Sequence, residues 1–336
     1  MALFINASVS PTVSNVRLCW QVGGTVAPIV PFPGGGAMPG SDYPGIPLGG
    51  AASMGDVRGL SSGEIRFYAI DAENLARLEQ GQTQTTTCDH LICGQGSGLP
   101  SSCLRYDLDY WPAAALPALD ASDPQSVLAL TGCLATALDP TASLTRCGSS
   151  WDAVEGNLRV ELAHLQPAPP LDAGQLSFQV ALLSPALAEA LGDGGALVSF
   201  GTEDGGTPVA TLGFEDDVEP AGSVGTVSLG TSLAVFGSRG FGVDAPGLAN
   251  GAGREWMSLV QAQQLVDPTQ DPAVFFGQPR TYLVAVVGDP GSPHAFTSTD
   301  AGYDGTGLHV LVIATPQPEA PDAGAPEDAG AEAAGE

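Results

Sequence analysis

The stretch that decides the fold is Val16-Arg17-Leu18-Cys19-Trp20-Gln21-Val22, in which every second residue is large and apolar. Alternation with a period of two residues is typical of a β-strand that buries one face. Two later stretches, Tyr282-Leu283-Val284-Ala285-Val286-Val287 and Leu308-His309-Val310-Leu311-Val312-Ile313, are almost continuously apolar. Such runs favour strands buried on both faces, and therefore central strands of a sheet.

Short elements joined by turns are expected along most of the chain. Glycine and proline contribute 45 and 28 of the 336 residues, a composition that favours turns over long helices. Further strands are predicted at 64–70, 158–165, 176–183, 196–200, 208–214, 224–229 and 232–236. The segment 23–55, dense in Gly and Pro, is predicted to be an irregular loop. The fold class predicted from these patterns is mainly β, with added loops and short helices.

Four helices are predicted from capping signals and from apolar residues spaced three or four apart. The first covers 72–80, with Asp71 as its cap. The second begins at Asp123-Pro124 and ends at about 138. A short helix begins at Ser184-Pro185 and ends at Gly192, and the last covers 254–266.

The six cysteines all lie in the first half of the chain, at Cys19, Cys88, Cys93, Cys103, Cys133 and Cys147. An even number of cysteines is typical of a disulfide framework and hence of an exported protein. A bridge from Cys133 to Cys147 is sterically reasonable, whereas the first four cysteines allow three pairings. We therefore expect an extracellular, periplasmic or outer-surface protein whose leader peptide has been removed. The alternative is a cytosolic protein with six reduced thiols.

Charge excludes one large class of partners. The chain has 37 acidic residues against 10 basic ones, all arginine, and a net charge of −27. Nucleic-acid binding requires clustered basic residues, but these arginines are scattered, so no nucleic-acid partner is expected. No run of about 18 apolar residues predicts a transmembrane segment. Nucleotide, phosphate and serine-nucleophile motifs are also missing, and no cofactor is predicted.

Three segments of the first half resemble the DUF4397 family of secreted Ig-like β-sandwich domains. They are the opening Phe4-Ile5-Asn6-Ala7-Ser8-Val9-Ser10-Pro11, the alternating strand after it, and Tyr43-Pro44-Gly45-Ile46-Pro47-Leu48-Gly49. The apolar run that begins at Tyr282 resembles the family's closing strands. The resemblance implies a bacterial exported or surface lipoprotein-like module without established catalytic residues. On this interpretation, residues 1–315 form a single antiparallel sandwich. Two insertions interrupt the sandwich: a cysteine-rich, partly helical one at about 71–153 and another at about 240–278. The acidic tail at 316–336 is expected to be disordered.

The segment Arg105-Tyr106-Asp107-Leu108-Asp109-Tyr110-Trp111 combines carboxylates with aromatic rings. If the segment is extended, Asp107 and Asp109 share a face with Arg105, and Tyr106 and Tyr110 share the other. Carboxylates can hydrolyse glycosidic bonds, and the rings, with Trp111, can stack on sugars. A secreted carbohydrate-active hydrolase or glycan-binding protein is therefore one alternative function. The structural interpretation is a solvated acidic face with Arg105 as an ion-pair partner.

Two acidic segments suggest a calcium-dependent adhesin as another alternative. Calcium requires several converging oxygen ligands, and the candidates are Glu215, Asp216, Asp217, Asp300 and Asp304. Neither segment has the spacing of an EF-hand, and the favoured interpretation is a solvated acidic turn. Cys88, His90 and Cys93 also lack the paired spacing of a zinc site, so no metal is predicted. The favoured function is a non-enzymatic surface or structural module that binds an unknown surface protein or glycan.

Overall fold

The computed structural model describes most of the chain, and every structural statement below concerns these residues. They are 2–23, 25–33, 45–55, 58–79, 87–88, 104–106, 108–119, 126–165, 171–172, 175–191, 196–212, 225–228, 237–244, 254–266, 269–277, 280–291 and 307–315.

The first half of the chain forms two sheets. The first inner sheet has the strand order β5 (Ala51–Gly55), β1 (Ala2–Asn6), β8 (Ser126–Thr131) and β9 (Arg159–His164). The first outer sheet has the order β3 (Thr25–Phe32), β2 (Asn15–Val22), β6 (Ile65–Asp71) and β7 (Tyr110–Pro112), and β4 (Ile46–Pro47) also pairs with β2. All pairings are antiparallel except that of β1 with β8, which is parallel.

The second half repeats this topology strand for strand. The second inner sheet has the order β13 (Gly225–Ser228), β10 (Gln175–Leu182), β16 (Arg280–Val287) and β17 (His309–Ala314). The second outer sheet has the order β12 (Gly205–Leu212), β11 (Ala196–Thr202), β14 (Gly240–Asp244) and β15 (Arg254–Ser258). Here too the first strand of the half, β10, is parallel to the penultimate strand, β16, and the other pairings are antiparallel. Apart from β4, each described strand of one half has a counterpart in the other, in the same chain order.

The two halves also correspond in register and in local packing. The penultimate strands β8 and β16 each run into a glycine with positive φ, Gly132 at 82° and Gly288 at 97°. In the outer sheets, Phe67 lies opposite Trp20, just as Phe241 lies opposite Phe200. The ring centroids of these pairs are 5.8 Å and 5.2 Å apart. The same strand order and aromatic positions in both halves are what a tandem duplication of one sandwich produces.

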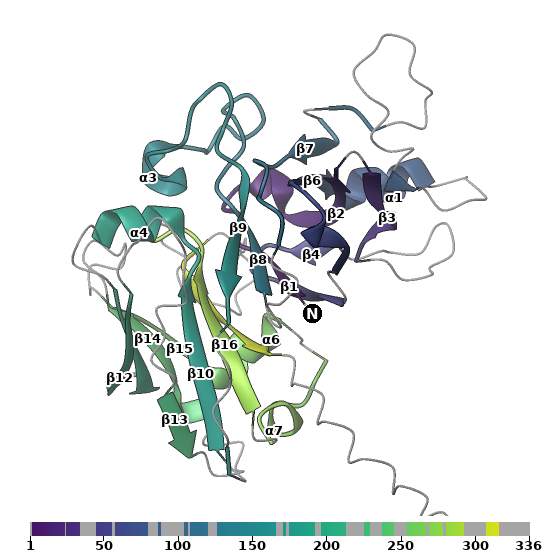
Figure 1. The fold of residues 1–336 in the computed structure, drawn as a ribbon. Coiled ribbons are helices and arrows are strands. Elements are labelled where there is room, and N and C mark those ends of the chain that lie inside the picture. Colours follow the sequence, from purple (N-terminus) through teal and green to yellow (C-terminus); the bar gives the residue numbers. More distant parts are fainter. Residues whose placement is uncertain are drawn as a thin grey trace, which may run out of the picture.

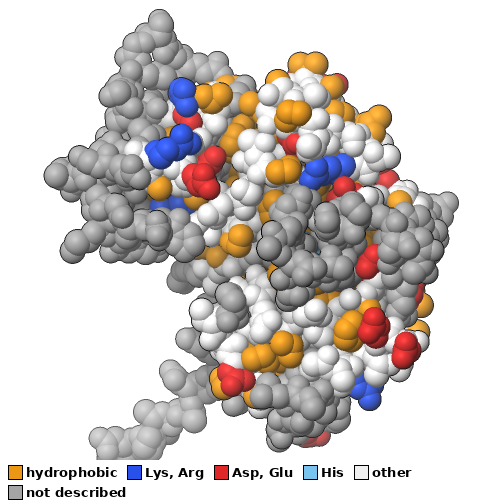
Figure 2. All heavy atoms as spheres, turned by 180° about the vertical axis from the view of Figure 1, so that it is seen from behind, with side chains coloured by type: hydrophobic (Ala, Val, Ile, Leu, Met, Phe, Trp, Pro, Cys, Tyr) orange, Lys and Arg blue, Asp and Glu red, His pale blue; other side chains and the backbone are white. Residues whose placement is uncertain are grey.

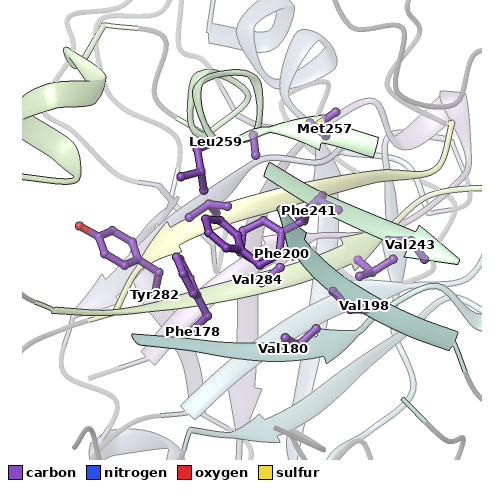
Figure 3. Close-up of a cluster of buried hydrophobic side chains, with 14 of the residues drawn as sticks. Phe178, Val180, Val198, Phe200, Phe241, Val243, Met257, Leu259, Tyr282 and Val284 are labelled. Atoms are coloured by element: carbon purple, nitrogen blue, oxygen red, sulfur yellow. The ribbon is translucent and has the colours of Figure 1, made fainter. Parts of the chain in front are cut away.

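The four sheets are arranged in layers (Figure 1), and three hydrophobic cores lie between them. The first core fills the space between the first inner and outer sheets, and the second core does the same in the second half, around Phe178, Phe200 and Phe241 (Figure 3). The interface core lies between the two inner sheets and joins Ile5 and Val127 to residues such as Leu283. Because both faces of each inner sheet are covered, β1, β8, β16 and β17 bury apolar side chains on both faces.

His309 lies in β17 within the interface between the halves. It is 1% exposed, and its Nδ1 lies 2.6 Å from the Gly307 carbonyl oxygen, to which the neutral ring donates. A Cβ at Gly49 of the first half would lie 2.1 Å from His309 Nε2, and Gly49 has φ of 66°. Burial lowers the pKa of His309 to about 4, although the hydrogen bond to Gly307 raises it. A neutral imidazole therefore packs directly against a turn of the other sandwich.

The structure confirms the mainly β sandwich class and corrects its organisation. The predicted insertion at 71–153 contains β7 and β8, and the one at 240–278 contains β14 and β15, so both supply strands to the sheets. The chain therefore forms two sandwiches instead of a single interrupted one. Each inner sheet also contains one parallel pair, where only antiparallel strands were expected.

Several predicted elements are confirmed. Helix α1 (Ala72–Glu79) is capped by Asp71, whose carboxylate accepts hydrogen bonds from the Glu73 and Asn74 amides. Helix α4 (Pro185–Leu191) follows Ser184, whose hydroxyl accepts a hydrogen bond from the Leu187 amide. Strand β16 is central as expected, but β17 lies at the end of its sheet and owes its burial to the cores on both faces.

Other predicted elements are wrong. The helix expected at 124–138 is replaced by β8, whose Ser126–Thr131 pairs with strands on both sides. The helix expected at 254–266 begins late, because its first residues form β15 and only Leu259–Gln264 are helical (α6). The predicted loop at 23–55 contains β3, β4 and β5. The predicted strand at 232–236 and the tail at 316–336 lie outside the described residues.

Candidate functional site

The connection between β6 and β7 distinguishes the two sandwiches. It covers 72–109 in the first half, whereas the matching connection between β14 and β15 covers only 245–253. Connections of a rigid scaffold are where binding residues are usually found, since they can vary without disturbing the core. The first sandwich therefore carries an elaboration, residues 72–109, that its structural counterpart lacks.

A disulfide fixes this elaboration to the outer sheet. Cys19 of β2 is bonded to Cys88, with a Cα–Cα distance of 5.7 Å. Both sulfurs belong to a buried cluster on the outward face of the sheet, together with Ile70, Leu75 of α1 and Tyr110. This bridge assigns one of the pairings that the sequence left open. Cys93 and Cys103 lie outside the described residues.

The elaboration ends in a turn at 105–109 that is closed by an ion pair. Arg105 Nε lies 2.9 Å from Asp109 Oδ2, and Nη2 lies 3.1 Å from Oδ1. The Arg105 amide also donates to Asp109 Oδ2, at 2.9 Å, and the Asp109 amide donates to the Arg105 carbonyl. The turn is tied to the start of α1, because the Asp71 amide donates to the Asp109 carbonyl at 3.0 Å. Side-chain and backbone hydrogen bonds thus join the two ends of the turn, Arg105 and Asp109.

Asp109 stays ionised in this arrangement. Burial raises the pKa of its carboxyl, but hydrogen bonds from Arg105, with the charges of Arg105 and Arg77, outweigh burial and place the pKa below its ordinary range. The predicted ion pair with Arg105 is therefore present. A carboxylate whose two oxygens both bind a guanidinium is poorly suited to donate a proton or to attack a sugar.

The aromatic residues of the predicted segment differ sharply in exposure. Trp111 and Tyr110 are 2% and 4% exposed, whereas Tyr106 is 42% exposed and Leu108 is 48% exposed. The Tyr106 and Tyr110 rings meet edge to face at 5.9 Å, and Tyr110 meets Tyr68 of β6 in the same way at 6.2 Å. Only Tyr106 can therefore offer much of its ring to a ligand. Asp107 lies outside the described residues.

Sequence reasoning missed Tyr68 as part of this group. Its hydroxyl lies 3.1 Å from Gln21 Oε1 on the neighbouring strand, and the side chain is half-buried. The signal was present in β6, where alternation places Arg66, Tyr68 and Ile70 on the outward face of the sheet. We call Tyr106, Tyr110 and Tyr68 the tyrosine ladder.

A second disulfide braces a different connection, between β8 and β9. Cys133 is bonded to Cys147, with a Cα–Cα distance of 5.6 Å, as the sequence predicted. Cys147 ends the short helix α3 (Leu144–Cys147), which lies beside α4 of the second half (Figure 1). The Ser149 amide donates to the Glu189 carboxylate of α4, and Arg146 Nε lies 3.8 Å from Asp289 Oδ2. This bridged loop therefore connects the two sandwiches at one end of their interface.

The predicted calcium ligands are not covered by the structure. Glu215, Asp216, Asp217, Asp300 and Asp304 all lie outside the described residues. Within the described part of the chain, no group of three or more His, Cys, Asp and Glu side chains could hold a metal ion. On the face seen in Figure 2, basic side chains lie close to acidic ones and do not form a separate patch.

Comparison with known proteins does not identify a family for this chain. No protein-family model matches the sequence, and no curated protein matches it. The resemblance to the DUF4397 family therefore stays a prediction. Among the described helices, none is long and apolar enough to span a membrane.

Proposed function

We propose that this chain is a non-enzymatic, exported binding or structural module of the bacterial surface type that the DUF4397 resemblance implies. The observation that carries the proposal is the pair of disulfides: Cys19–Cys88 fixes a long connection to the outer sheet, and Cys133–Cys147 braces the connection between β8 and β9. Such bonds persist in oxidising compartments and are reduced in the cytosol. Rigid loops on a stable scaffold are also typical of binding modules.

The chemistry of the most suggestive acidic residue supports a non-catalytic role. Asp109 is paired through both oxygens with Arg105, and its low pKa removes it as a general acid. Glycosidases generally require two carboxyl groups that flank a bond, with one of them protonated. Asp109 serves the architecture of the turn instead.

The test is an activity screen of the oxidised full chain against aryl glycosides and aryl esters, in parallel with Asp109→Asn. We expect no turnover above the rate with heat-denatured protein. Turnover by the full chain that Asp109→Asn abolishes, while its circular dichroism spectrum stays unchanged, would contradict the proposal.

A further inference from the structure

The exposed tyrosine of the first sandwich stands on an unusually well-fixed turn. Tyr106 and Leu108 are both more than two-fifths exposed, yet the turn between Arg105 and Asp109 is held by side-chain and backbone hydrogen bonds at both ends. Exposed apolar side chains contribute little to folding. A rigid exposed ring is useful in recognition, because little conformational entropy is lost when a ligand covers it.

Contacts with two other tyrosine rings support the orientation of the Tyr106 ring. The edge-to-face contact of Tyr106 with the buried Tyr110, and of Tyr110 with Tyr68, connects the exposed ring to the outer sheet. Tyr110 sits in the cluster that contains the Cys19–Cys88 bridge. The tyrosine ladder is therefore continuous with a covalently fixed part of the sandwich.

The charge of the chain disfavours an anionic ligand. The exposed guanidinium of Arg105 is paired with Asp109, whose carboxylate also feels the charge of Arg77. The chain as a whole carries a net charge of −27. An anionic ligand would therefore be repelled at long range.

We propose that the Tyr106 surface, meaning Tyr106, Arg105 and Leu108 on the tyrosine ladder, binds a neutral polysaccharide. This rests on the proposed function as a binding module and names its ligand class. A pyranose ring presents apolar C–H groups that pack on an aromatic face, and hydroxyls at its rim that accept hydrogen bonds. Asp109 engages Nε and Nη2 of Arg105, so Nη1 remains to donate to a sugar hydroxyl beside the ring.

The length of the connection 72–109 also supports placing the binding site on the first sandwich. The matching connection of the second sandwich, residues 245–253, is much shorter than 72–109 and contains no cysteine, so it cannot form a bridge like Cys19–Cys88. Where two halves share one topology and only one of them has a long, disulfide-fixed connection, binding capacity is expected on that half. The second sandwich then serves as support through the interface core.

The experiment is affinity gel electrophoresis of the oxidised full chain in gels that contain hydroxyethylcellulose, xylan or galactomannan, with polygalacturonate as the anionic probe. We expect retardation by at least one neutral polysaccharide and none by polygalacturonate. Tyr106→Ala should weaken the retarding interaction about tenfold, as expected for removal of a central aromatic contact. Tyr106→Trp should restore it, since the larger ring still stacks.

Leu108→Ala is the matched control, because it removes an exposed apolar side chain from the same turn but no ring. Its binding should change less than twofold. The proposal is overturned if no neutral polysaccharide retards the chain, if Tyr106→Ala binds as well as wild type, or if the anionic probe alone is bound. These outcomes are independent of the turnover measurement, so the ligand class can fail while the non-enzymatic function stands.

Discussion

His309 should make the stability of the protein fall on mild acidification. The imidazole is neutral and fully buried between the two sandwiches, with its pKa lowered to about 4 by burial. In the unfolded chain the pKa returns to its ordinary value of about 6.5. Between these two values the unfolded state binds a proton that the folded state does not. The stabilising contribution is therefore complete above pH 6.5 and is lost progressively as pH falls towards 4.

The size of the effect follows from these two pKa values. A difference of 2.5 between about 4 and 6.5 corresponds to about 3 kcal/mol when the loss is complete. At pH 5 the unfolded imidazole is almost fully protonated and the folded one is about one-tenth protonated, so roughly 2 kcal/mol is already lost. For a chain of this size, that loss lowers Tm by roughly 3 °C.

The assay compares wild type with His309→Gln, which has a similar volume and does not titrate. Urea unfolding at pH 7.5 and pH 5.0, followed by circular dichroism, gives a free energy of unfolding for each. Carboxylates common to both proteins cancel in the difference. Wild type should lose about 2 kcal/mol more than His309→Gln on acidification. Equal losses would refute the reasoning, because they would mean that His309 is not held neutral in the interface.

Three further predictions concern the same architecture. Gly49→Ala should lower Tm, because its Cβ would lie 2.1 Å from His309 Nε2 and φ is 66°; an unchanged thermal transition would argue against this packing. Phe178→Ala should lower the free energy of unfolding, measured in urea, by about 3–5 kcal/mol, since the ring packs on two other phenylalanines of the second core. A decrease of less than about 1 kcal/mol would be inconsistent with that core. Replacing Cys133 and Cys147 together by serine should lower the free energy of unfolding by about 3 kcal/mol, because the unfolded chain regains the entropy that a cross-linked loop of this length had lost. Equal stability with and without the bridge would speak against its structural role.

The sequence predicted the strands that alternate or are uniformly apolar, because that periodicity follows directly from the burial of one face or both. It failed for β8. Ser126–Thr131 follows an Asp-Pro cap and is equally compatible with a helix, and its conformation is decided by pairing with β1, more than a hundred residues earlier in the chain. Such pairing leaves no local signal.

The strand β3 shows a second limit. Its Thr25–Phe32 contains Pro28 and Pro31, which predicted a loop, since proline cannot donate to a ladder. In the structure β3 lies at the edge of its sheet, where one side of the strand needs no partner. Position within a sheet depends on the whole topology, so proline content alone misled the prediction.

The repeated topology of the two halves escaped detection for a related reason. Strands β8 and β16 share only Ala129 with Ala285 and Gly132 with Gly288 in their aligned registers. What the halves retain is a pattern of burial, which many unrelated sequences satisfy. At the candidate site, the sequence predicted that Arg105 pairs with an aspartate of the segment, and it included Tyr106 among the candidate ligand-binding residues. It could not show that Tyr110 and Trp111 are buried, since that depends on how the turn docks against β6.

The most direct test of an exported, disulfide-fixed module is a disulfide map of the full chain recovered from an oxidising compartment. Peptides are alkylated and digested without reduction and identified by mass spectrometry. The structure predicts linked peptides that join Cys19 to Cys88 and Cys133 to Cys147, with none of these four thiols alkylated before reduction. Free thiols at these positions, or a different pairing among them, would contradict the account.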